Sequence, residues 1–486
     1  MHPATGFRRG PAVAAHPGCR PDRLKPDIGS RAGPPVRRSP LSSAVMSDAA
    51  TGPDRNYLNQ LRAATAAAAE RASPPRSDHQ GAPPAVEQAV SGRLDVCAAE
   101  LTAVSHQLHA NPEQAFAERQ AVSVISAALQ HRGFEVESGI GGLDTAFRAS
   151  VGVPGGRPHV AVLAEYDALP GIGHGCGHNV IAAAGLGGFL GAAAGIDHTG
   201  GRVSLIGTPG EEGHGGKEYL ARAGVFDDVD AVVMTHPFGG YDIATQPFLG
   251  RRQLAVTFHG VAAHASAQPF MGVNALDAAV AAYQGVAALR QHLPPTDRVH
   301  GIVTEGGERP NIVPERAALL FYFRSATPET LRTLASRLET IVCTAAEMHG
   351  CGSTLEWDPH PAYLPIRHNE TLAARWATHQ ATRGRKALPD GVVPQFLTGS
   401  TDLGNLSVRV PAMHPMIGIG DPEIAMHTRE FADAAIRDEA DRAVLDGAYG
   451  LAMTALDYLA DPDLRAAVTA EFEAAGGALD VPGYFG

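Results

Sequence analysis

A cysteine and a histidine two residues apart are the strongest chemical signal in this chain. Cys176 and His178 lie in a glycine-rich turn, residues 173–179, directly after the apolar run 160–167. A thiolate and a neutral imidazole at this spacing can bind one cation, and the pair suits Zn²⁺ or Mn²⁺. The alternative is a thiol buried as a small hydrophobe, which a glycine-flanked turn accommodates poorly. The turn therefore predicts a metal site.

Two adjacent carboxylates, Glu211 and Glu212, follow a second apolar run, residues 203–208. On an extended backbone neighbouring side chains point to opposite sides, so Glu212 can bind metal while Glu211 acts as a general base. A cation pair lowers the pKa of bound water from about 15.7 toward about 7. Two solvated surface acids are the alternative, which their place at the end of an apolar run disfavours.

The elements that must position these residues read as alternating strands and helices. Extended runs are predicted at 146–151, 160–167, 203–208 and 231–235, with helical segments between the last three. This alternation indicates right-handed crossovers and a mainly parallel sheet with flanking helices, an α/β fold. Ligands gather at the carboxyl ends of such strands. The Cys/His turn, the glutamate pair and His236 all follow strand ends.

A second domain is predicted inside the first. Residues 248–364 have the order βαββαβ, which is typical of a ferredoxin-like unit. The catalytic fold then comprises residues 89–247 and 365–486. Residues 1–88, rich in Pro, Arg, Ala, Gly and Ser, are predicted to be a disordered extension, within which Met46 is our hypothesis for the true translation start.

Composition excludes several classes of function. A chain of 486 residues is expected to hold more than one domain, and its net charge of −12 argues against a nucleic-acid partner. Five scattered cysteines are typical of a reducing cytoplasm rather than a disulfide framework. The most apolar segment, residues 180–196, is interpreted as a helix packed on a sheet, so we expect no membrane partner.

Several motifs then carry a resemblance to a known family. They follow one another in this order: His109-Ala110-Asn111-Pro112-Glu113, Ala164-Glu165-Tyr166-Asp167-Ala168-Leu169-Pro170, Gly175-Cys176-Gly177-His178-Asn179, Gly210-Glu211-Glu212-Gly213, Gly260-Val261-Ala262-Ala263-His264-Ala265, Asn311-Ile312-Val313-Pro314, Gly399-Ser400-Thr401-Asp402 and Met426-His427-Thr428. In order and spacing the chain resembles the M20 metallopeptidases. Within them it is most similar to the amidohydrolase branch, in the subgroup of aminobenzoyl-glutamate hydrolase and M20-domain-containing protein 2.

The resemblance implies a dinuclear centre that uses two divalent metal ions, Zn, Mn or Co. The implied metal ligands are Cys176, His178, Glu212, His236 and His427. Asp167 is expected to orient a ligand rather than bind metal. Many members have a metal-binding histidine where this chain has Glu165, so the bridging atom stays open. For His427 the alternative is a residue that merely neighbours a helix cap.

Three further residues are assigned by the resemblance to the inserted domain. His264 is expected to reach the active site of a partner subunit and stabilise the oxyanion, which implies a homodimer through this domain. Asn311 and Arg324 are expected to bind a substrate carboxylate. The alternatives are a surface loop histidine for His264 and a strand-edge ion pair for Arg324.

Together these features predict a metal-dependent hydrolase. Its expected substrate is a small molecule with an amide bond: an N-acyl amino acid, an aminobenzoyl-glutamate-like compound or a dipeptide. One alternative is a catalytically silent, metal-stabilised peptide-binding protein. Another is nucleophilic attack by Cys176 with His178 as base, although residues this close on a turn share a metal more easily than they achieve an attack geometry.

Overall fold

A computed structural model of the chain describes residues 53–395 and 397–485. Met46 lies outside the described residues, and the compact unit that holds the fold begins at Asn56. Its central element is a six-stranded sheet with the order β1-β2-β4-β3-β5-β13. The strands are, in that order, Glu137–Ser138, Phe147–Gly152, Arg202–Gly207, His159–Ala164, Ala231–Val233 and Ala412–Met413.

The sheet is mainly parallel, as the alternating pattern predicts. Strands β4, β3, β5 and β13 run in the same direction, whereas β2 is antiparallel to β4 and β1 is antiparallel to β2. The carboxyl ends of β3, β4 and β5 therefore meet at one edge. The prediction that the Cys/His turn and the glutamate pair start from a common edge is confirmed.

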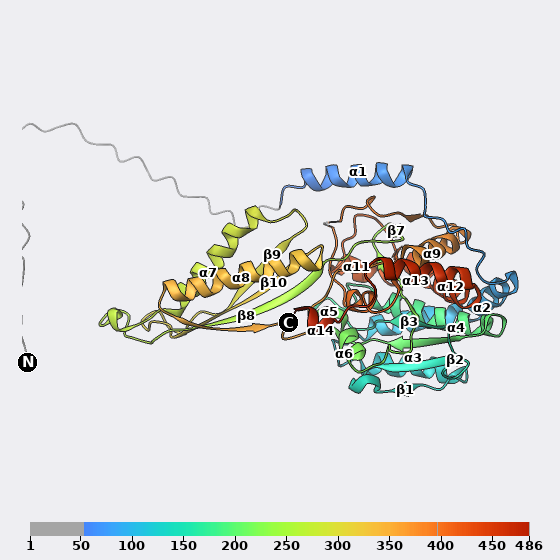
Figure 1. Cartoon of the computed structure of the whole chain (residues 1–486), viewed down its shortest axis with the longest axis horizontal. Helices are drawn as coiled ribbons and strands as arrows, with labels where there is room; N and C mark the ends of the chain where they lie inside the picture. Colours follow the sequence, from blue (N-terminus) through green and yellow to red (C-terminus); the bar gives the residue numbers. More distant parts are fainter. Residues whose placement is uncertain (1–52, 396, 486) are drawn as a thin grey trace, which may run out of the picture. The chain divides into compact units, whose positions relative to one another are not determined.

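Helices cover both faces of this sheet (Figure 1). In β3, Val160 and Val162 belong to the core on one face, while Ala161 and Leu163 belong to the core on the other. Burial on both faces explains why the strand is a continuous apolar run. The principal helices of the two faces are α2 (Pro84–Ala110), α4 (His178–Thr199) and α12 (Asp438–Ala460), and α6 (Gly216–Arg222) and α10 (Leu403–Ser407).

Helix α4 is long and apolar enough to cross a membrane, yet 89% of its most apolar window is buried inside the protein. It packs against α2 and α12, and its glycines permit the close approach: a Cβ on Gly187 would lie 2.7 Å from the Cβ of Ala448. We therefore interpret α4 as a core helix, in agreement with the sequence.

A second, smaller sheet was not predicted as a unit. It has the order β12-β7-β14-β6, with strands Ala387–Leu388, Asp242–Ile243, Met416–Gly418 and His236–Phe238. Strand β14 is parallel to β6 and antiparallel to β7. This sheet matters for the site because β6 begins with His236.

The inserted segment forms an antiparallel four-stranded sheet with the order β11-β8-β10-β9. Helices α7 and α8 pack on it and enclose a core of their own (Figure 1). The strands in sequence order and the helices are Gly250–His259, Arg298–Glu305, Arg316–Ser325 and Gly352–Trp357, and Ala275–Leu289 and Pro328–Met348. The predicted ferredoxin-like unit is confirmed.

The predicted disorder through residue 88 is wrong for part of the described segment. Helix α1 spans Asn56–Arg71, and α2 begins at Pro84, ahead of the predicted boundary. Alanine has the highest helix propensity, and the alanine-rich run within α1 outweighs the proline and glycine around it. The remaining α-helices are α3 (Arg119–His131), α5 (Glu211–His214), α9 (Glu370–Thr382), α11 (Arg429–Ala434), α13 (Pro462–Ala474) and α14 (Val481–Phe485).

Candidate metal centre

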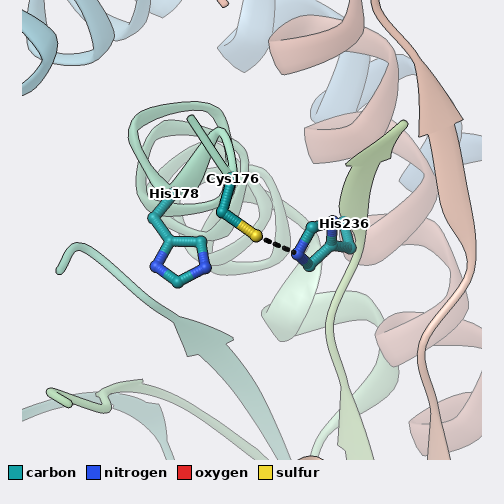
Figure 2. A group of neighbouring side chains, drawn as sticks. All are labelled: Cys176, His178 and His236. Carbon is teal, nitrogen blue, oxygen red and sulfur yellow. Dashed lines mark hydrogen bonds between the residues drawn. The ribbon is translucent and has the colours of Figure 1, made fainter. Parts of the chain in front are cut away.

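The Cys/His turn and the start of β6 bring three buried ligands together. The Sγ atom of Cys176 lies 3.5 Å from Nε2 of His236, and the ring of His178 lies beside them (Figure 2). Gly177 makes the turn possible: its φ of 76° is left-handed, and a Cβ there would lie 2.5 Å from Cγ of Pro237. One cation can therefore contact all three side chains.

Two further predicted ligands extend the group. Oε1 of Glu212 lies 3.6 Å from Nε2 of His427 and 3.9 Å from Nε2 of His178. His427 adopts a left-handed φ of 63°, rare for a residue other than glycine, and its backbone N–H donates to the carbonyl of Gly175 at 2.7 Å. That bond fixes the His427 loop on the Cys/His turn.

The ligand atoms form two overlapping groups. In the first, Cys176, His178 and His236 offer atoms within 4.8 Å of one another; in the second, Cys176, Glu212 and His427 do so. Cys176 is common to both. All five side chains predicted as ligands are thus brought together, around two positions that share one sulfur atom.

The chemistry of these atoms fits divalent cations. Ligands at about 2.0–2.3 Å from a tetrahedral ion lie about 3.3–3.8 Å apart, close to the separations observed. Among the described residues, Nε2 of His178 and Oε1 of Glu212 are buried and have no hydrogen-bond partner. Unpartnered polar atoms are costly inside a protein, and a metal ion satisfies them.

The histidine ring nitrogens are prepared for metal binding. Nδ1 of His236 donates to the carbonyl of Pro237 at 2.7 Å, and Nδ1 of His178 lies 3.1 Å from Oδ1 of Asp167. Each Nε2 is thereby left as the lone-pair donor. Burial lowers the pKa of His236 to about 4, which keeps its imidazole neutral at pH 7.

Asp167 connects both halves of the centre. Its Oδ2 accepts the backbone N–H of Glu212 at 2.9 Å, while Oδ1 holds His178. Burial disfavours a charged carboxylate here, but the hydrogen bond from His178 outweighs it and lowers the pKa of Asp167. The position agrees with the predicted orienting role.

Glu211 lies next to the ligands but differs from the prediction in its backbone. The chain leaves the extended conformation at Gly210, with φ of 68°, and Glu211 opens the short turn α5. The two glutamates therefore diverge because the turn is irregular, and the predicted extended backbone is wrong. Oε2 of Glu211 lies 3.9 Å from Nε2 of His178, and burial together with neighbouring carboxylates, Glu165 foremost, raises its pKa well above the usual range.

Sequence reasoning missed a buried ion network beside Glu211. Nζ of Lys217 donates to Oε1 of Glu165 at 2.5 Å and to Oδ1 of Asp402 at 2.6 Å, and all three side chains are fully or almost fully buried. The other oxygen of Glu165, Oε2, lies 3.4 Å from Nε2 of His178 and has no hydrogen-bond partner among the described residues. The excess charge at position 165 is thus balanced by a lysine 52 residues away.

The residues predicted on the inserted domain do not join the metal groups within this chain. His264 and Asn311 are exposed and lie on paired segments, since His264 bridges Ile312. Arg324, near the end of β10, is partly buried and donates from Nε to the hydroxyl of Ser400 at 3.1 Å. The alternative of a strand-edge ion pair is not observed for Arg324 among the described residues.

A mainly parallel α/β sheet that gathers sulfur, nitrogen and oxygen ligands beside a buried glutamate, with a ferredoxin-like insertion, defines a metallohydrolase. Residues 250–348 match the family model described as the peptidase dimerisation domain. The Xaa-Arg dipeptidase of Mus musculus is 38% identical over 398 residues, covering 78% of this chain and 90% of that protein. The chain belongs to the M20 metallopeptidase family, and it is a hydrolase of amide or peptide bonds.

Other relatives agree with this assignment. A p-aminobenzoyl-glutamate hydrolase of Escherichia coli is 33% identical in one of its polypeptides over 302 residues, which cover 58% of this chain and 62% of that polypeptide. Among solved structures, the aminobenzoyl-glutamate utilization protein from Klebsiella pneumoniae has a TM-score of 0.59 at 22% identity, covering 76% of this chain and 98% of that one. A putative aminohydrolase from Staphylococcus aureus has a TM-score of 0.63 at 21% identity, covering 77% of this chain and all of the other. These two structures share the fold.

Proposed function

We propose that this protein hydrolyses the amide bond of a dipeptide or an N-acyl amino acid that carries a free carboxylate, using two divalent metal ions. The observation that carries the proposal is the pair of ligand groups that share Cys176, with Glu211 beside them. The names of the relatives, a dipeptidase and an aminobenzoyl-glutamate hydrolase, support this substrate class.

In the proposed centre, Cys176, His178 and His236 hold one ion, and Cys176, Glu212 and His427 hold the other. The shared thiolate is the proposed bridge, which a mixed S/N/O set allows for Zn, Mn or Co. Burial raises the pKa of the Cys176 thiol well above its usual range, so this thiol loses its proton only when a cation binds. When bound, the ions polarise the scissile carbonyl and lower the pKa of water.

Glu211 is the proposed general base. Its carboxylate accepts a proton from the attacking water and delivers that proton to the leaving amine. The raised pKa of Glu211 suits both transfers, because a carboxyl near neutrality can take up and release a proton at physiological pH. The ammonium of Lys217 compensates the charge of Glu165, which is the first of the neighbouring carboxylates that raise this pKa.

His264 and the substrate-binding residues support a homodimer. Nδ1 of His264 accepts the backbone N–H groups of Ser266 and Ala267 at 3.3 and 3.1 Å, so the neutral ring carries its proton on Nε2. An exposed ring with a free N–H donor suits an oxyanion formed in a partner subunit. The edge strand β9, where Ile302 and Val303 are 59% and 49% exposed, is an apolar edge that a second copy can cover.

In this proposal Arg324 and Asn311 bind the substrate carboxylate. Burial lowers the pKa of Arg324, and no acidic side chain among the described residues pairs with it, so a carboxylate ligand supplies the missing counter-charge. The net charge of −12 and the four free cysteines among the described residues support a cytoplasmic enzyme acting on small molecules.

The test is Glu211→Gln on metal-loaded protein, assayed with a panel of dipeptides, acyl amino acids and aminobenzoyl-glutamate. We expect the variant to keep its metal ions and lose activity by several orders of magnitude. A matched control is Glu218→Gln, in a buried glutamate that pairs with Arg409 and is absent from the metal groups. Near-wild-type turnover of Glu211→Gln contradicts the mechanism, whereas tight substrate binding by the wild type without product supports a binding protein instead.

A further inference from the structure

The backbone of the loop that carries the two glutamates lacks regular hydrogen bonding. Gly210 and Gly213 have left-handed φ values of 68° and 86°, and Glu212 between them has φ −65° and ψ 75°. Such a backbone cannot form a helical ladder, so its carbonyl groups need donors from elsewhere. The sources of these donors determine what holds the base and the ligand in place.

Two of the donors come from the junction of the inserted domain with the catalytic fold. The hydroxyl of Tyr363 donates to the carbonyl of Glu211 at 2.7 Å, and Nη2 of Arg251 donates to the carbonyl of Gly213 at 3.2 Å. Arg251 is the second residue of β8, where the chain enters the inserted domain, and Tyr363 follows β11, where it returns. The carbonyls on both sides of Glu212 are therefore held from outside the loop.

Arg251 and Tyr363 act as one unit, which we call the junction clamp. Each backbone N–H donates to the other residue's carbonyl at 2.8 Å, and the Arg251 guanidinium lies 4.0 Å from the centre of the Tyr363 ring. Both side chains are almost completely buried. A clamp built from two strands and a stacked cation is rigid, because neither side chain can turn away without losing several contacts.

We propose that Tyr363 and Arg251 are positioning residues of the reaction, which hold Glu211 and Glu212 in register with the metal ions. The inference rests on the proposed function, because it assigns the clamp a role through Glu211 as base and Glu212 as ligand. The clamp also links the inserted domain to the catalytic loop: a displacement of the junction moves the carbonyls that flank Glu212.

The experiment compares Tyr363→Phe with Tyr322→Phe. Tyr322 also stacks on Arg251, at 5.3 Å, but its hydroxyl makes no hydrogen bond among the described residues. Tyr363→Phe is expected to lower kcat about tenfold, the effect of one lost buried hydrogen bond, with KM within about twofold. Chelator competition with Zn²⁺ is expected to show weaker binding of one ion, the one held by Glu212, and unchanged binding of the other.

A second pair of variants provides a rescue. Arg251→Lys keeps a cation and a donor, whereas Arg251→Met keeps only the stem, so we expect kcat and the affinity for the Glu212 ion to fall more in Arg251→Met. Equal values for Tyr363→Phe and Tyr322→Phe overturn the proposal. So does equal weakening of both ions accompanied by a lower unfolding temperature, which indicates a purely structural role. If the wild type cleaves no substrate, the proposed function fails, but the zinc competition still tests the clamp.

Discussion

Removal of the Lys217 charge is the perturbation with the largest predicted effect on stability. Its ammonium lies 2.5 Å from Glu165 and 2.6 Å from Asp402, and none of the three side chains is more than 1% exposed. Lys217→Met preserves the length of the side chain but leaves two buried carboxylates without a cation. Breaking a buried ion pair costs about 3–5 kcal/mol of the free energy of unfolding.

The loss depends on pH, and its direction follows from the carboxyl pKa values. Burial already raises the pKa of Asp402, and loss of the ammonium raises it further. A carboxyl whose folded pKa exceeds its unfolded value of about 3.9 binds more protons when folded, so stability falls as pH rises through the folded pKa. We therefore expect the full cost at pH 8 and a smaller cost at pH 5, where the variant can protonate.

The assay is urea unfolding of metal-free protein at both pH values. The control, Lys386→Met, changes an exposed lysine whose Nζ contacts only the backbone carbonyls of Ala69 and Glu70, and it is expected to cost less than about 1 kcal/mol. Adding Asp402→Asn to Lys217→Met removes one unpaired carboxylate and should recover part of the loss. A Lys217→Met variant as stable as the control at pH 8 refutes the reasoning.

Three further predictions concern the metal centre and the dimer. Cys176→Ser should lower the affinity for both ions in chelator competition, whereas loss of only one ion contradicts a shared thiolate. Metal affinity should fall as pH drops below 7, since burial raises the pKa of Glu212 to about 7 and protons compete with the ions; calorimetry in buffers of different ionisation enthalpy should detect proton release on binding, and its absence contradicts the scheme. Mixing Glu211→Gln with His264→Ala protein should restore part of the activity through heterodimers, and no recovery argues against action in the partner site.

The ligand set could be predicted because each member follows a strand end within a short motif. Cys176 and His178 share a glycine turn, and the parallel order of β3, β4 and β5 brings that turn to the glutamate loop. His236 was harder to place, because β6 belongs to a sheet of strands only two or three residues long. Strands that short leave no periodic pattern in the sequence.

The residues that support the site escaped prediction because their partners are distant in the chain. Lys217 meets Asp402 across 185 residues, and Tyr363 meets the Glu211 carbonyl across 152. No local spacing encodes such contacts, since they arise only when the two parts of the catalytic fold close around the insertion. Helix α1 was missed for the opposite reason: its local alanine propensity was judged by the surrounding proline and glycine.

The most direct test is a crystal structure of the zinc-loaded protein with anomalous diffraction recorded at the zinc edge. We predict two ions per chain, about 3.5–4 Å apart, with Sγ of Cys176 bound to both and the carboxylate of Glu211 near the space between them. A single ion, or two ions of which neither contacts Cys176, contradicts the account.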